Sequence, residues 1–197
     1  MAYDGDLLGG ALLLWETKEI ASLLIKNPTK EEFKRAVEVD NILQKRSISS
    51  AKRNAGAARK RLELLGKDFI EALVSADTEL STQICMAGTI KRNKLLLGDF
   101  MLNVMSDYYI LHKIKIKKYT WETYVKELQS DYPEDLNFSQ ASLTKMRNVV
   151  FNILSQAGYI DNPRNGTLQK VFVREELKDL LHKNQEKYVL KCMEVAK

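Results

Sequence analysis

Three pairs of adjacent cationic residues recur at intervals of seven in the first third of the chain: Lys45-Arg46, Lys52-Arg53 and Arg59-Lys60. Seven residues are close to two turns of an α-helix, so the pairs within one helix stack on one side of it. The opposite side carries mostly alanine, which predicts close packing on neighbouring helices. Cations aligned in this way can neutralise successive phosphates of a nucleic acid. The alternative is a solvated helix face without a ligand.

The start of the same segment adds groups that bind anions. Ser47 and Ser49 are candidate N-caps of the basic helix. The free amides and the dipole of a helix N-terminus attract phosphate, so we add Ser49 to the residues predicted to contact phosphate. A short helix over 29–39 followed by a basic helix over 49–65 has the outline of a helix-turn-helix, whose second helix enters the major groove of DNA. The connection is longer than the usual turn of that motif.

A second candidate surface lies over 139–152. Ser139 is the predicted N-cap of a helix with an apolar stripe on one side and polar side chains on the other. On the polar side, Ser139, Gln140 and Ser142 suit phosphates, Lys145 and Asn148 suit base edges, and Thr144 projects beside them. A plain amphipathic helix explains the same pattern, so a recognition helix and an ordinary surface helix both remain open.

Helix signals cover most of the chain, so the predicted fold class is all-α. The predicted helices span 11–25, 29–39, 49–65, 68–75, a helix capped by Asp77, 95–111, 120–130, 139–157 and 175–193. Asn165-Gly166 between apolar runs is a strong hairpin signal and predicts a small β-hairpin over 159–173, which would form a wing. The pattern of helix signals restarts near 113–120. This restart divides the chain into an N-terminal region, 1–112, and a C-terminal region, 113–197.

The charge distribution also favours a polyanionic partner. The 197 residues carry a net charge of +5, a mild bias. However, residues 41–67 hold eight basic residues against one acidic residue, and residues 91–119 hold seven against two. Concentrated basic blocks on an otherwise acidic chain predict a positive surface.

Other classes of protein are set aside by what the sequence lacks. The longest uninterrupted aliphatic and aromatic run, 11–15, is far below the roughly 18 residues of a membrane span. No basic leader region precedes it, so we expect no signal peptide. The cysteines, Cys85 and Cys192, and the histidines, His112 and His182, all stand apart, so no disulfide, metal site or cofactor is expected. We expect a monomeric, cytoplasmic protein without catalytic residues.

Three stretches of the chain resemble the BrxA family of bacteriophage exclusion (BREX) defence systems. They are Leu7-Leu8-Gly9-Gly10-Ala11-Leu12-Leu13-Leu14-Trp15-Glu16-Thr17, Asn41-Ile42-Leu43-Gln44-Lys45-Arg46-Ser47 and Leu154-Ser155-Gln156-Ala157-Gly158-Tyr159-Ile160. The resemblance implies a mostly helical, non-enzymatic protein that binds double-stranded DNA and acts beside a methyltransferase and other BREX proteins. It also implies two helix-turn-helix units, which would map onto 29–65 and 120–157. A nearly all-helical family leaves little place for the hairpin over 159–173.

Two other functions fit the same residues. Basic helices on helical bundles also bind RNA, so an RNA-binding module is one alternative. The basic face also suits an acidic protein partner, such as the methyltransferase or ATPase of such a system, so a protein-interaction adaptor is the other.

Overall fold

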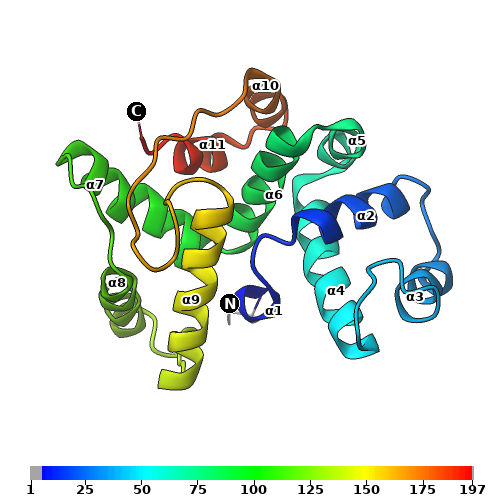
Figure 1. The fold of residues 1–197 in the computed structure, drawn as a ribbon, viewed down its shortest axis with the longest axis horizontal. Helices are drawn as coiled ribbons and strands as arrows, with labels where there is room; N and C mark the ends of the chain where they lie inside the picture. The colour runs from blue at the N-terminus through cyan, green and yellow to red at the C-terminus, as the bar shows by residue number, and fades with distance from the viewer. Residues whose placement is uncertain (1–5, 197) are drawn as a thin grey trace.

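The computed structural model describes residues 6–196, and within them the chain forms helices and no regular sheet (Figure 1). This confirms the predicted all-α class. The helices are α1 (Asp6–Gly9), α2 (Leu14–Leu24), α3 (Lys30–Glu38), α4 (Ile48–Leu65), α5 (Lys67–Ser75), α6 (Thr78–Arg92), the π-helical η1 (Lys94–Gly98) and η2 (Phe100–Met105), α7 (Ser106–Ile110), α8 (Lys118–Asp131), α9 (Gln140–Gln156), α10 (Glu175–Lys183) and α11 (Lys187–Met193). None of them within 6–196 has the length and apolarity to cross a membrane.

Helix α6 runs through the middle of the molecule and separates two groups of helices (Figure 1). Helices α2 to α5 lie on one side of α6, and α7, α8, α9 and α11 lie on the other, while α10 lies above the upper end of α6. The short helix α1 packs against both α4 and α9, and the backbone amide of Leu12 donates to Oε1 of Gln156 at 3.0 Å. The start of the chain therefore joins the two groups. The predicted division into 1–112 and 113–197 stays a prediction.

Local signals in the sequence set the ends of α3 and α4. Thr29 and Glu32 form a capping box that starts α3, as each side chain accepts from the other residue's backbone amide. Ser47 accepts from the amide of Ser50 and so caps α4, which ends before Gly66 at φ 101°. The buried side of α4 carries the residues expected there: Ala51, Ala55, Ala58, Leu62 and Leu65.

The long apolar helix expected over 95–111 is present, but it is wound differently. From Lys94 to Met105 most of the turns close i→i+5 bonds, which rotates the later residues away from α-helical register. Of the apolar residues that the pattern over 95–111 places on one face, Leu97 and Met101 are buried, Val104 and Tyr108 pack partly buried against the core, and Leu111 is 62% exposed. Leu111, at the end of the predicted helix, therefore lies outside the core.

The single helix expected over 175–193 was also wrong, because it divides into α10 and α11. Gln185 adopts a left-handed conformation with φ 59°, which interrupts the helix. The side chain of Asn184 bonds Asp68 of α5, and Glu186 pairs with Lys91 of α6. These contacts turn the chain so that α11 packs its apolar residues against α6 and η2.

The predicted hairpin over 159–173 is reduced to one isolated antiparallel bridge, and a second bridge joins it to the segment before α8. Ile160 pairs with Leu168, and Lys115, which precedes α8, pairs with Thr167. Segment 166–168 therefore lies between 159–161 and 114–116, and Tyr109 holds the chain beyond it by donating to the carbonyl of Gln169 at 2.7 Å. Helix α8 itself begins at Lys118, two residues before the start predicted at residue 120.

A buried ion pair holds α1 against α4 and the end of α6. The guanidinium of Arg61 donates from Nε and Nη2 to Oδ2 of Asp6 at 3.1 and 2.8 Å, and from Nη1 to the carbonyl of Ala11 at 2.7 Å. The side-chain amide of Asn93 donates to the same carboxylate oxygen at 2.8 Å. The side chain of Arg61 is only 2% exposed, so this cation of the basic run cannot reach an external phosphate.

We expect Arg61→Met to lower the free energy of unfolding by about 3–5 kcal/mol, because it leaves the carboxylate of Asp6 buried without its counter-ion. Urea unfolding followed by circular dichroism measures the loss. Arg53→Met is the matched control on the exposed side of α4 and should cost less than about 1 kcal/mol. Equal losses in the two variants would contradict the central role of the buried pair.

Replacing either of two glycines by alanine should change the stability of the fold in opposite directions. Gly166 has φ 66°, and a Cβ there would lie 2.2 Å from the carbonyl oxygen of Ile116, so Gly166→Ala should destabilise the fold by about 1–3 kcal/mol. Gly56 lies inside α4, and a Cβ there would have no atom within 4 Å, so Gly56→Ala should stabilise the fold by about 0.5–1 kcal/mol. Thermal unfolding compares the two, and stabilisation by Gly166→Ala would contradict the tight approach of 166 to 116.

Candidate nucleic-acid interface

The basic residues of the first candidate surface lie on and just before α4. Lys52, Arg53, Arg59 and Lys60 are on the helix, on the side away from its buried alanines, as the spacing predicted. Lys45 and Arg46 precede the helix in the loop 39–47, where the side chain of Asn41 accepts from the amide of Lys45. We call these six residues with Ser49 the α4 cation cluster.

Three members of the α4 cation cluster already have carboxylate partners. Lys45 Nζ lies 2.6 Å from Oε1 of Glu16, and Lys52 Nζ lies 3.1 Å from Oε1 of Glu38. The third pair joins Arg59 to Glu63, one turn later on α4. The cluster therefore carries less uncompensated charge than its sequence indicates.

Aromatic rings hold two of these paired cations in place. Lys45 Nζ lies 5.7 Å from the ring centroid of Trp15, and the guanidinium carbon of Arg59 lies 4.6 Å from that of Phe33. Such contacts favour the observed position of a cation over an extended one. Both side chains consequently serve the packing of α2 and α3 on α4.

The remaining members of the α4 cation cluster are exposed. Arg46 and Arg53 make no ion pair with the rest of the described chain. Lys60, by contrast, has an interaction within the molecule. Ser49 is exposed in the first turn of α4, although Ser47 provides the cap. Arg46 and Arg53 are thus the cations of this surface with the fewest internal contacts.

The second surface is the polar side of α9. Ser139 accepts from the amide of Ser142 at 3.2 Å and caps the helix as predicted, and the two hydroxyls lie 3.1 Å apart. Gln140 and Lys145 are exposed, and Thr144 and Asn148 are partly buried. The buried stripe of α9 is Leu143, Met146, Val150, Phe151, Ile153 and Leu154, so the polar residues project outward.

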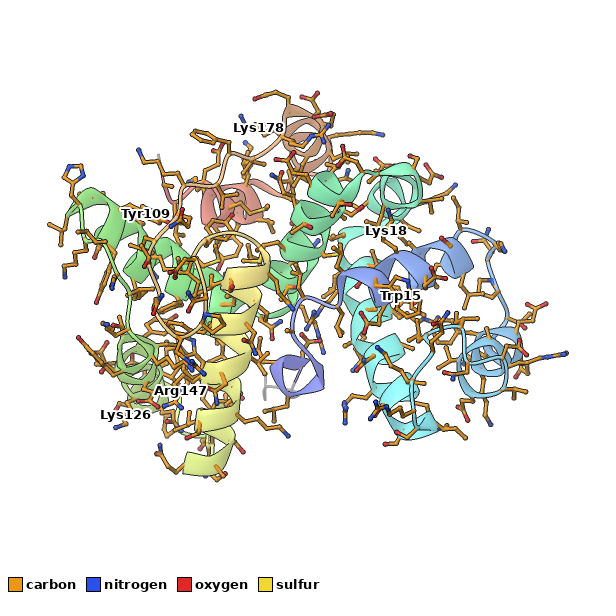
Figure 2. All side chains as sticks on the ribbon, viewed as in Figure 1. Trp15, Lys18, Tyr109, Lys126, Arg147 and Lys178 are labelled. Atoms are coloured by element: carbon orange, nitrogen blue, oxygen red, sulfur yellow. The ribbon has the colours of Figure 1, made fainter. Side chains whose placement is uncertain are left out.

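The structure adds Lys118 to this surface. The sequence shows the charge of this residue but not its position beside α9. Lys118 begins α8, and its Nζ donates to Oδ1 of Asn148 at 3.0 Å. Arg147 fills the space between α8 and α9 by pairing with Glu122 at 2.5 Å (Figure 2). The run of lysines over 113–118 indicated a basic segment in the sequence. Only the packing of α8 on α9 shows which of these lysines reaches the polar side of α9.

The turn 162–165 lies beside the start of α8. Lys118 and the turn residues Asn162, Pro163, Arg164 and Asn165 line an open hollow of about 560 Å³. Arg164 is exposed, and its side chain has no ion pair within the described chain. Two cations from segments far apart in the sequence therefore border one concave surface.

Asp161 fixes the shape of this turn. Its carboxylate accepts from the amides of Asn162 at 2.6 Å and Thr167 at 2.8 Å. Burial raises the pKa of Asp161, but these hydrogen bonds outweigh it, so the pKa lies below the usual value and the side chain is ionised at neutral pH. The side chain of Asn162 in turn accepts from the amides of Arg164 and Asn165, which completes a rigid turn.

Neither surface contains an arrangement that suggests catalysis. Within residues 6–196, no three His, Cys, Asp or Glu side chains gather in a way that could hold a metal ion. Burial raises the pKa of Cys85 to about 12, so its thiol is protonated at neutral pH and is a poor nucleophile. The chemistry available at both surfaces is charge and hydrogen bonding.

Comparison with known proteins identifies relatives along nearly the whole chain. The BrxA family model matches residues 1–185. The BREX protein BrxA of Paramagnetospirillum magneticum (strain ATCC 700264 / AMB-1) is 31% identical over 194 residues, which cover 98% of this chain and 97% of the relative. The BREX protein BrxA of Escherichia coli O9:H4 (strain HS) is 30% identical over 193 residues, which cover 98% of this chain and 90% of the relative.

A solved structure agrees with this relationship. The crystal structure of an uncharacterized protein from Magnetospirillum magneticum superposes with a TM-score of 0.91 at 30% identity, covering 99% of this chain and 100% of that chain. This chain and that protein therefore share a fold as well as sequence similarity. This chain belongs to the BrxA family.

Proposed function

We propose that this BrxA family member is a non-enzymatic protein of BREX phage defence that binds double-stranded DNA through α9 and the turn 162–165. The observation that carries the proposal is the grouping of Lys118, Lys145, Asn148 and Arg164 around the polar side of α9 and the neighbouring turn. These side chains come from three segments and include exposed cations beside a group suited to a base edge.

The order of elements supports this assignment. Helix α7, the paired segment 114–116, helices α8 and α9, and the paired segments 159–161 and 166–168 follow one another in the order of a winged helix-turn-helix. In that arrangement the helix equivalent to α9 enters the major groove, and the turn equivalent to 162–165 contacts the backbone beside it. Lys145 and Asn148 would then face base edges, and Ser139, Gln140, Ser142 and Thr144 would lie near phosphates.

The α4 cation cluster is proposed as a second contact to the DNA backbone. Arg46 and Arg53 are its strongest candidates, because Lys45, Lys52 and Arg59 would have to exchange an internal carboxylate for a phosphate. Ser49 and Lys60 are exposed on the same side. The two surfaces together offer about six phosphate contacts, so the logarithm of the affinity should fall against the logarithm of salt with a slope of about −5.

We expect Lys145→Glu/Arg164→Glu to weaken binding to duplex DNA by about tenfold or more and to reduce the salt slope by about 1, since Arg164 is the phosphate contact that is lost and Lys145 faces a base edge. Fluorescence anisotropy with a labelled duplex over a series of salt concentrations measures both quantities. Arg46→Glu/Arg53→Glu, tested in the same way, reports the contribution of the α4 cation cluster.

Lys187→Glu/Lys191→Glu is the matched control, because it makes the same change in net charge at exposed lysines of α11. It should leave the slope nearly unchanged. Equal losses in the control and the Lys145/Arg164 variant would contradict a local site on α9. Stronger binding to structured RNA than to the duplex, with the same variants impaired, would favour the RNA-binding alternative instead.

A further inference from the structure

The segment between α7 and α8 forms an outer edge of the molecule. Lys115 pairs with Thr167 through two bonds made by its neighbours: the amide of Ile116 donates to the carbonyl of Gly166, and the amide of Leu168 donates to the carbonyl of Ile114, each at 2.9 Å. In this type of antiparallel pair, the N–H and C=O of Lys115 itself point away from Thr167. They make no backbone hydrogen bond within residues 6–196.

Within residues 6–196, no other segment pairs with that edge, and Lys113, Ile114, Lys115 and Lys117 are exposed. The segment joining α7 to α8 runs along the left margin of the molecule, with the loop 159–173 on its inner side (Figure 1). An open edge of this kind is a template for another extended chain. The available pairing groups are those of Lys115 together with the amide of Lys117.

Exposed apolar side chains accompany the open edge. Four of the twelve large apolar side chains exposed within 6–196 lie in the ten residues 110–119: Ile110 at 66%, Leu111 at 62%, Ile114 at 72% and Tyr119 at 65%. Hydrophobic residues exposed singly are ordinary, but several in one short segment mark an interaction surface. Phosphate groups would gain nothing from this apolar area.

The charge of the edge selects the chemistry of its partner. Lys113, Lys115 and Lys117 alternate with Ile114 and Ile116, and no acidic residue occurs between Asp107 and Glu122. These three lysines make no ion pair within the described chain, although Lys113 lies over the ring of Tyr108. Pairing with a second copy of the same edge would place lysines opposite one another, which is unfavourable.

We infer that the outer edge of 113–117 is a docking site for an extended segment of another protein in which acidic and apolar residues alternate. The segment would pair its backbone with Lys115, place its carboxylates against the three lysines and cover Ile114. This inference does not rest on the proposed DNA contact, because it uses neither α9 nor the turn 162–165.

The probe is a fluorescein-labelled peptide of alternating glutamate and valine, titrated with the full chain. Binding should raise its anisotropy, and NMR-detected hydrogen exchange should slow at the amide of Lys115. Lys113→Glu/Lys115→Glu/Lys117→Glu should weaken binding by about tenfold or more, because three exposed ion pairs are lost. Lys187→Glu/Lys191→Glu should bind the peptide as the unchanged protein does.

Two further reagents separate strand pairing from simple charge attraction. The same peptide with methylated backbone amides keeps its carboxylates but cannot donate, so it should lose most of its affinity. Lys115→Pro removes the outward amide and should bind more weakly than Lys115→Ala, with circular dichroism confirming that both variants are folded.

Several results would overturn the inference. Undiminished binding of the methylated peptide would reduce the contact to charge alone, and absence of peptide binding would remove the docking site. A triple lysine variant that loses duplex DNA affinity more than peptide affinity would identify the lysines as phosphate contacts. Dimerisation through this edge, or binding to anionic phospholipid vesicles in place of the peptide, would assign it a different occupant.

Discussion

The buried pair between Asp6 and Arg61 is the constraint on which the arrangement of the two groups of helices depends. Burying a carboxylate and a guanidinium is unfavourable unless their hydrogen-bonding groups are satisfied. Here Asp6 also accepts from Asn93 at the end of α6, while Arg61 bonds the carbonyls of Gly10 and Ala11. These bonds hold the turn after α1 against α4 and α6. Because α1 also packs on α9, the geometry set at this pair extends to the second group of helices.

The same pair determines what the basic helix can do. Arg61 enters the core beside the buried alanines of α4, so the other cations of this helix stay on its outer side. The cations left outside then meet the acidic residues of α2, α3 and α4 itself, so that several of them stabilise the packing of the N-terminal helices. The charge of a segment in the sequence is therefore an upper limit on the charge that it can offer to a ligand.

Features set by neighbouring residues could be predicted from the sequence, whereas features set by distant packing could not. The capping box of Thr29 and Glu32, the cap at Ser47, the cap at Ser139 and the buried alanines of α4 all follow from local spacing. In the π-helical stretch the carbonyls of Leu95 and Leu96 accept from side chains of α8, and the residues on either side of Gln185 bond α5 and α6. For the candidate sites, side-chain types indicated α4 and α9, but the approach of Lys118 to Asn148 required the packing of α8 on α9.

The lysine-rich segment 113–118 shows how one run of charge divides between two surfaces. Its last residue starts α8 and turns toward α9, where it borders the hollow shared with Arg164. The alternate lysines before it flank a backbone edge whose inner side is occupied by 166–168. This division follows from the bridge between Lys115 and Thr167, because that pairing fixes which backbone groups of the segment face inward. A nucleic acid on α9 and an extended protein segment on the outer edge would consequently address different residues of the same short run.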